Sequence, residues 1–342
     1  MDIVRLGKTL RDRKEPAFRF GQAKKAFTVD LVESWEGVTT WSKTLRAEMA
    51  EAVPWDELLV LEVREGAEGD AVKFLFACVS DGAKIETVVM RHEDDRNTVC
   101  VSSQVGCPMK CAFCATGAMG FKRNLTAEEI FDQIVHAARW IKQKGGRVTN
   151  VVYMGMGEPM HNYDEVMRSV RLLNDADGFN LGARHISIST CGIIPGILKL
   201  AEEPEQVNLA ISLHAAVPAT RTRIMPVNAA YPLDSLMKAV AEYAEKTNRK
   251  VFFEYLLLDG INDSKKDALA LAKLMMKNKR LYHANIIKYH DTHAFTATPR
   301  EGRVQFVTWL HEAGVPATHR RSFGEDIRAA CGQLATSSSL SS

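Results

Sequence analysis

The sequence contains no apolar run that could cross a membrane. A membrane helix needs about 18 consecutive apolar residues, and no stretch of the 342 residues reaches that length. The first residues, Met1 to Arg5, also lack the apolar segment of a secretory signal peptide. We therefore expect a cytoplasmic protein that has no membrane partner.

The chain also has almost no net charge, because 44 Lys and Arg residues stand against 42 Asp and Glu residues. Net charge alone therefore makes no case for a nucleic-acid partner. The distribution of charge is more informative, since basic residues outnumber acidic ones between Arg5 and Lys25. The basic residues there are Arg5, Lys8, Arg11, Arg13, Lys14, Arg19, Lys24 and Lys25. Such a cluster can contact phosphates, although a solvated helix face would have the same composition.

Cysteine is present in an odd number, seven, which indicates a reducing compartment and excludes a fully paired disulfide framework. Three of the seven, Cys107, Cys111 and Cys114, follow the spacing C-x3-C-x2-C. No further Cys or His follows within the next twenty residues, and His136 is the first. A structural zinc site normally needs four ligands, so this motif does not favour zinc. The loop between the cysteines also does not look like buried core.

Three thiolates at this spacing can each bind one iron of a [4Fe–4S] cluster, which leaves the fourth iron without a protein ligand. An open iron can bind the amine and carboxylate of S-adenosylmethionine. The motif therefore resembles that of the radical SAM enzymes, which reduce S-adenosylmethionine to a 5′-deoxyadenosyl radical. We predict a [4Fe–4S] cluster on Cys107, Cys111 and Cys114.

The rest of the chain falls into four predicted parts. Residues 1–56 have a helical pattern, and residues 57–97 contain three strand patterns separated by Gly-containing turns, which predicts an antiparallel β extension. From residue 98 to 335, apolar strand patterns alternate with amphipathic helix patterns. This alternation predicts an α/β fold with a parallel sheet, a partial (β/α)6 barrel. Residues 336–342 are polar, and we expect a disordered tail.

Polar residues end three successive predicted strands of this barrel. Gly157 and Glu158 follow the second strand, Ser189 ends the third, and Ser212 and His214 end the fourth. In a parallel barrel the reactive groups gather at the C-terminal ends of the strands. These residues are therefore candidates for binding S-adenosylmethionine, although each could instead be a turn or helix-capping residue. The other cysteines, Cys78, Cys100, Cys191 and Cys331, are by themselves best read as small buried hydrophobic residues.

Taken together, these segments resemble the radical SAM 23S rRNA adenine methyltransferases of the RlmN/Cfr family. The resemblance extends from about Pro16 to Leu334. Its most specific stretches are Cys100–Cys107, Gly120–Thr126, Met154–Pro159, Ser187–Gly192, Ala210–His214 and Asp326–Leu334. It implies a radical SAM barrel, two molecules of S-adenosylmethionine per turnover, an RNA-binding N-terminal domain and an electron donor such as flavodoxin. It also implies a monomer that methylates an adenosine of 23S rRNA and, in some members, of tRNA.

The same resemblance implies roles for individual residues. Cys331 would carry the methyl group, Cys100 would release the product by forming a transient disulfide with Cys331, and Glu86 would accept a proton. The implied contacts to S-adenosylmethionine are Gly157, Glu158, Ser189, Ser212, Leu213, His214 and His290. Carbon C2 of adenine is electron-poor, so we expect a radical on the S-methyl group of Cys331 to add to the ring. Besides the N-terminal basic stretch, candidates for contacts to RNA phosphates are Arg320, Arg321 and Arg328.

One position departs from the family pattern. After the sixth predicted strand the family usually has an Asn-Pro pair, whereas this chain has His290 and Asp291. Imidazole differs from an amide in size and in hydrogen-bonding capacity. We prefer methylation at C2. The alternatives are methylation at C8, as in the Cfr branch, a radical SAM enzyme with a non-RNA substrate, and a non-catalytic iron–sulfur or zinc module that binds RNA.

Overall fold

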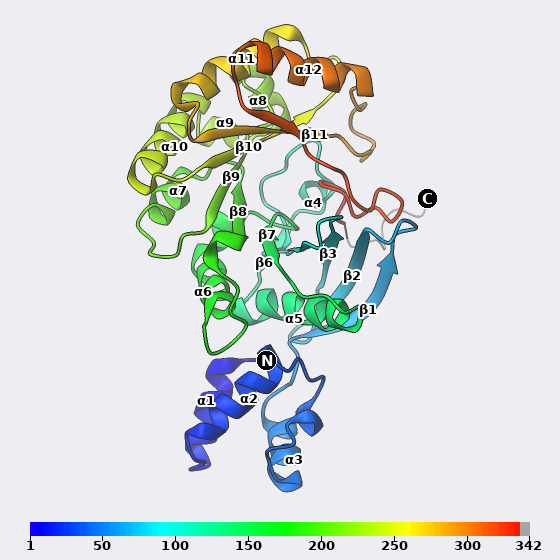
Figure 1. Ribbon diagram of the computed structural model, residues 1–342, viewed down its shortest axis with the longest axis vertical. Helices are drawn as coiled ribbons and strands as arrows, with labels where there is room; N and C mark the ends of the chain where they lie inside the picture. Colours follow the sequence, from blue (N-terminus) through cyan, green and yellow to red (C-terminus); the bar gives the residue numbers. More distant parts are fainter. Residues whose placement is uncertain (336–342) are drawn as a thin grey trace.

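The computed structural model of the protein describes residues 1–335 (Figure 1). The predicted disordered tail, residues 336–342, lies outside the described residues. Within the described part, no helix combines the length and apolarity needed to span a bilayer.

The N-terminal region consists of short helices that project from one end of the molecule (Figure 1). They are α1 (Ile3–Asp12), α2 (Phe18–Thr28), the 3₁₀ helix η1 (Trp35–Gly37) and α3 (Lys43–Ala52). Asp2 begins α1 by accepting a hydrogen bond from the Arg5 N–H at 2.8 Å, the usual N-cap arrangement. Leu6 and Leu10 are buried one turn apart, so the basic residues of α1 face outward.

Ten strands form one sheet in the order β1-β2-β3-β4-β7-β8-β9-β10-β11-β12. The antiparallel part, β1 to β4, comprises Leu58–Glu65, Ala71–Cys78, Lys84–Arg91 and Asn97–Cys100. The parallel part continues from β4 through β7 (Asn150–Tyr153), β8 (Ile186–Thr190), β9 (Asn208–Ser212), β10 (Val251–Leu257), β11 (Tyr282–Lys288) and β12 (Ala317–His319). The antiparallel extension is therefore not a separate sheet, because β3 pairs directly with β4.

Helices cover the outer face of the parallel sheet (Figure 1). The main ones are α5 (Ala127–Gln143), α6 (Tyr163–Asn174), α7 (Ile194–Leu200), α10 (Leu233–Thr247), α11 (Lys265–Met275) and α12 (Arg300–Glu312). Shorter elements are α4 (Ala115–Ala118), α8 (Pro218–Ile224), α9 (Val227–Ala230), η2 (Pro159–Asn162), η3 (Ala183–His185) and η4 (Met276–Asn278). A two-stranded hairpin, β5 (Gln104–Gly106) with β6 (Phe121–Asn124), lies beside the sheet.

Alternation of strand and helix patterns correctly predicted the α/β fold and its partial barrel. A capping box begins α5, since Thr126 accepts from the Glu129 N–H and the Glu129 carboxylate accepts from the Thr126 N–H. The parallel strands are short and buried on both sides. Val151, Ile188 and Leu209 are buried on one face, and Val152, Ala210 and Glu254 are buried on the other. Their C-terminal ends therefore meet at one end of the barrel, where the candidate site lies.

Candidate active site

The cysteine loop begins at the end of β5 and is held in place by backbone contacts. Gly106 has a φ of +75°, and a Cβ atom there would lie 1.8 Å from the carbonyl oxygen of Gly120. Only glycine fits at this point, which lets the β5–β6 hairpin close beneath the loop. Farther along, the Ala112 N–H donates to the Ile224 carbonyl at 2.9 Å. Backbone contacts therefore hold the loop from both sides.

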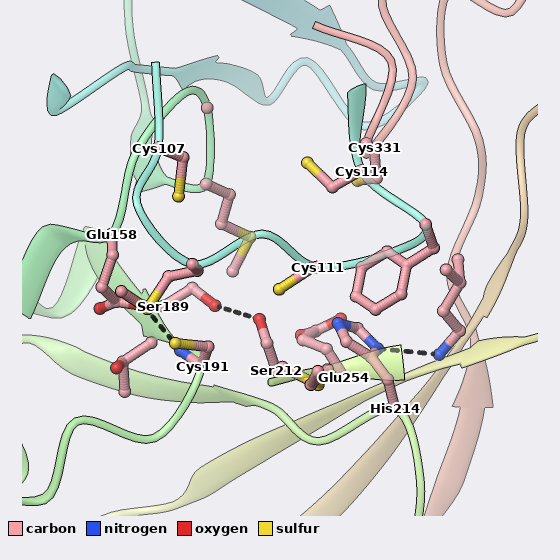
Figure 2. A pocket seen from close by; sticks show the side chains of 18 of the residues that line it. Cys107, Cys111, Cys114, Glu158, Ser189, Cys191, Ser212, His214, Glu254 and Cys331 are labelled. Atoms are coloured by element: carbon pink, nitrogen blue, oxygen red, sulfur yellow. Dashed lines mark hydrogen bonds between the residues drawn. The ribbon is translucent and has the colours of Figure 1, made fainter. Parts of the chain in front are cut away.

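A first cavity of about 150 Å³ opens between the cysteine loop and the ends of the parallel strands (Figure 2). The site residues predicted from the sequence that line it are Cys107, Cys111, Cys114, Gly157, Glu158, Ser189, Ser212, His214 and Cys331.

The three motif cysteines suit a multi-iron cluster better than a single metal ion. Burial raises the pKa of the Cys107 thiol to about 12, and burial together with neighbouring Cys114 and Cys107 raises the pKa of Cys111. Neutral thiols of this kind become ligands when a metal displaces their protons. Among residues 1–335, the one group of three potential ligands within 4.8 Å of one another is Asp56, Asp132 and His136. The three motif sulfurs are therefore not all within 4.8 Å of one another, as thiolates around one zinc ion, each about 2.3 Å from the metal, would be.

Glu158 presents a carboxylate whose orientation is set by backbone donors. Oε1 accepts from the Met160 N–H at 3.0 Å and Oε2 from the Cys191 N–H at 2.8 Å (Figure 2). Gln104 in turn accepts from the Glu158 N–H at 2.9 Å. Each carboxylate oxygen keeps a further lone pair, so Glu158 can accept a hydrogen bond from the amine or hydroxyl of a ligand.

Ser189, Ser212 and His214 form a polar edge across the ends of β8 and β9. The hydroxyl oxygens of Ser189 and Ser212 lie 3.2 Å apart. His214 Nδ1 accepts from the Leu256 N–H at 3.1 Å, so its proton resides on Nε2. Burial lowers the pKa of His214 to about 3, which keeps the ring neutral at physiological pH. This edge offers hydroxyl groups and one N–H to a ligand, without a formal charge.

A second cavity, of about 80 Å³, adjoins the first on the side of β3 and β4. Cys100 and His290 line this second cavity, and Cys114, Arg320 and Cys331 line both. Cys331 therefore faces the cluster loop on one side and the space around Cys100 on the other; Figure 2 shows its side chain beside Cys114. All seven cysteines are free thiols. Burial and nearby Cys331 raise the pKa of Cys100 to about 12, against the opposing effect of Arg320.

Arg320 lies at the site, where it is paired with a buried carboxylate. Its Nη1 pairs with the buried Glu254 carboxylate at 3.2 Å and lies 3.3 Å from the sulfur of Met154. Arg320 was a candidate RNA contact from the sequence, and that contact stays a prediction. In the structure its guanidinium is paired with Glu254 and lines both cavities.

Three predicted site residues do not line the first cavity. Leu213 is buried, and its carbonyl accepts from Arg221 at 3.2 Å. His290 lines the second cavity and not the first. Glu86 lines neither; its carboxylate pairs with Lys73 at 3.2 Å and accepts from the Ala335 N–H at 2.9 Å. The role of Glu86 as proton acceptor stays a prediction, while its visible contact anchors the segment that carries Cys331.

Sequence reasoning missed Cys191, Glu254 and Arg320 as residues of the first cavity. Cys191 was taken as a small buried hydrophobic residue, but it directly follows β8, where strand-end residues meet the cavity. Glu254 is a carboxylate within a strand that is otherwise apolar, Val251–Leu257. This charge in a buried strand was the one signal in the sequence that could have identified Glu254 as a site residue, because buried charges are normally paired or functional.

Gly157 is expected to be essential for ligand binding because no side chain fits there. Its φ is +105°, and a Cβ atom would lie 2.7 Å from the Cβ of Gln104, which positions Glu158. We expect Gly157→Ala to weaken S-adenosylmethionine binding at least tenfold in equilibrium dialysis. The matched control is Gly82→Ala, at φ +70° with no atom within 4 Å. Both lose about 1 kcal/mol of stability through backbone strain, but Gly82→Ala should bind normally; equal affinities would contradict the prediction.

Comparison with known proteins gives consistent matches over nearly the whole chain. A family model described as the Radical SAM superfamily matches residues 101–272. A protein of Dictyoglomus thermophilum, named a probable dual-specificity RNA methyltransferase RlmN, is 42% identical over 335 residues, 97% of this chain and 94% of its own. A protein of Bacillus cytotoxicus with the same name is 43% identical over 327 residues, 95% of this chain and 89% of its own. The crystal structure of a radical SAM methyltransferase from Sphaerobacter thermophilus superposes with a TM-score of 0.93 at 43% identity, covering 98% of this chain and 97% of that one.

Proposed function

Because this chain belongs to the RlmN family of radical SAM RNA methyltransferases, we propose that it methylates C2 of an adenosine in 23S rRNA through a methyl group carried on Cys331. The relatives are named dual-specificity enzymes, and we extend the proposal to an adenosine of tRNA. The predicted monomeric state and the flavodoxin-like electron donor stay predictions.

A [4Fe–4S] cluster and S-adenosylmethionine are the cofactors of this family, with two molecules of the latter per turnover. When bound, they supply a methyl group and the radical that activates it. Cys107, Cys111 and Cys114 would hold the cluster. The residues that would contact S-adenosylmethionine all line the cavity beside the three cysteines; they are Gly157, Glu158, Ser189, Ser212 and His214.

The observation that carries the proposal is the position of Cys331 between the two cavities. Its segment is bound to the cluster loop by two hydrogen bonds, from the Ala115 N–H to the Gly332 carbonyl at 2.8 Å and from the Thr116 hydroxyl to the Leu334 carbonyl at 2.6 Å. A thiol held in this way can receive a methyl group on one side and present it to a base on the other.

Cys100 is suited to the release step. After the ring is alkylated, its thiolate would attack the Cys331 sulfur and form a disulfide, while the electron pair of the sulfur–carbon bond stays with the transferred carbon, which takes up a proton to become the methyl group. The one electron that remains from the radical addition would be accepted by the iron–sulfur cluster when it is bound. A thiol with a pKa raised to about 12 is protonated at neutral pH, which protects the resting enzyme from forming that disulfide early. The Arg320 guanidinium nearby favours the thiolate when the proton leaves.

RNA binding is assigned to the exposed face of α1. Arg5, Lys8 and Arg11 on α1 and Lys14 just after it are exposed, and none of them forms an ion pair with another of the residues 1–335. Phe18 nearby is 60% exposed, with the Arg19 guanidinium 5.2 Å from its ring centroid. Unpaired cations beside an exposed aromatic ring suit phosphate contacts and base stacking.

Reversing charges on α1 is expected to weaken RNA binding in a salt-dependent way. For Lys8→Glu/Arg11→Glu, the slope of log affinity against log salt should become shallower by about 1 for each phosphate that the protein no longer neutralises. Lys238→Glu on α10, also exposed, is the matched control. Filter binding at several salt concentrations measures the slope, and identical slopes for the two proteins would remove α1 from the interface.

The decisive test of the function is methylation of RNA from a strain that lacks the modification. The protein is reconstituted anaerobically, supplied with a reductant and S-adenosylmethionine, and the RNA nucleosides are identified by mass spectrometry against 2-methyladenosine and 8-methyladenosine standards. We expect 2-methyladenosine. A product at C8 would assign the chain to Cfr-type chemistry, and absence of any methylated RNA despite production of 5′-deoxyadenosine would indicate a different substrate.

A further inference from the structure

The wall of the second cavity contains an imidazole and a hydroxyl that are bonded to each other. His290 Nε2 lies 3.0 Å from the Ser322 hydroxyl oxygen, and both residues line the cavity together with Cys100 and Cys331. The His290 side chain is 4% exposed, and its Nδ1 lies 3.8 Å from the Glu325 carboxylate. Ser322 is only partly buried, so its hydroxyl is the member of the pair that a bound base would meet first.

The surroundings keep the His290 imidazole neutral. Burial lowers its pKa below the usual 6.5, Glu325 opposes this, and Lys288 on β11 and Arg303 on α12 lower it further. Glu325 is also paired with Lys288, and this pairing weakens the stabilisation of a protonated His290 by the Glu325 carboxylate. Arg320 and Arg321 are the other charged groups lining the cavity. A neutral imidazole at physiological pH can accept a proton.

We propose that His290, acting through Ser322, accepts the proton that leaves the methylated carbon of the substrate adenine. This inference rests on the proposed function. The C–H bond breaks heterolytically, its electron pair stays with the substrate, and its proton passes to the Ser322 oxygen while the Ser322 proton moves to His290 Nε2. The disulfide-forming attack by Cys100 follows in the same cavity. No oxidant or reductant is needed for this step.

The geometry favours His290 over Glu86 for this role. The Glu86 carboxylate is occupied by Lys73 and by the Ala335 N–H, and it lines neither cavity. His290 shares the cavity with both reacting cysteines. The family pattern predicts an amide at position 290, and this chain has an imidazole there. Under the proposal the imidazole is tolerated because His290 lines the second cavity, which would hold the adenine, and not the first cavity, which contains the Glu158 carboxylate.

The test compares His290→Asn and Ser322→Ala with the wild type and with His283→Asn. His283, on β11, bonds the Thr318 hydroxyl at 3.1 Å but lines neither cavity, so it controls for loss of a histidine–hydroxyl pair. Three quantities are measured in single turnover with reconstituted enzyme: methylated RNA, 5′-deoxyadenosine, and RNA covalently attached to protein on a denaturing gel. The RNA substrate is used with hydrogen or deuterium on the methylated carbon.

If the inference is right, both cavity variants form methylated RNA on the order of 10²-fold more slowly, while the rate of 5′-deoxyadenosine formation stays within twofold of wild type. The RNA–protein adduct accumulates, and deuterium slows its decay. The rate of methylation by the wild type then decreases as the pH is lowered below 6.5, because the imidazole becomes protonated. The rate of His290→Asn does not show this decrease. His283→Asn behaves as wild type.

Two results with His290→Asn would overturn the inference. One is a His290→Asn enzyme that methylates RNA at the wild-type rate, which leaves the proposed function intact. The other is parallel loss of methylation and 5′-deoxyadenosine formation in His290→Asn, which would return His290 to a role in binding S-adenosylmethionine. A Glu86→Gln enzyme that alone accumulates the adduct would assign the proton to Glu86 instead. If the wild type methylates no RNA, the inference and the proposed function both fail.

Discussion

Replacing Cys331 by alanine is expected to abolish RNA methylation while leaving cleavage of S-adenosylmethionine to 5′-deoxyadenosine intact. The side chain lies between the two cavities and is the one thiol that lines both without belonging to the C-x3-C-x2-C motif. Without it no atom can carry the methyl group to the base, but the cluster ligands are unchanged. Chromatography of the nucleosides, together with mass spectrometry of the intact protein, measures both the methyl transfer and the methyl–cysteine intermediate.

The control for this change is Cys78→Ala. Cys78 is a buried thiol on β2 that lines neither cavity, so its loss tests for unspecific effects of removing a cysteine. Cys100→Ala should give a third result, with the methyl group loaded onto Cys331 and RNA left covalently attached to the protein. A Cys331→Ala enzyme that makes the wild-type product would disprove a methyl–cysteine mechanism outright.

Replacing Cys111 by alanine is expected to remove the cluster, and with it both methylation and 5′-deoxyadenosine formation, to below detection. Each motif cysteine would bind one iron, and the cavity offers no other thiolate at the same position in the loop. Iron analysis and the visible absorption spectrum of anaerobically prepared protein measure the loss directly. These readouts do not depend on RNA, so they separate the cluster from the identity of the substrate.

Cys191→Ala is the informative control for the cluster. Cys191 also lines the first cavity. Burial is the main cause of the raised pKa of its thiol, and nearby Glu158 and Cys111 raise this pKa further. If the three motif cysteines are the ligands, Cys191→Ala retains the full iron content and absorption. Loss of iron in this variant would make Cys191 a fourth ligand, and the open iron needed for S-adenosylmethionine would then be lost.

The cluster motif could be recognised from the sequence because its determinants are local. Cys107, Cys111 and Cys114 lie within one loop, so their spacing alone limits what they can bind together. The barrel could be predicted for a similar reason, since strand and helix periodicities are properties of short segments. Strand ends that meet at one face of a parallel barrel then brought Glu158, Ser189 and Ser212 together as expected.

Contacts between distant segments became known from the three-dimensional fold. The amino-acid sequence was enough to predict the fold class, the cysteine loop and the strand-end residues, because spacing and periodicity act over a few residues. It did not determine that Arg320 pairs with Glu254, that Glu86 anchors the Cys331 segment, or that His290 shares a cavity with Cys100. Those contacts join segments that are far apart along the chain, and their geometry depends on how the whole sheet twists and packs.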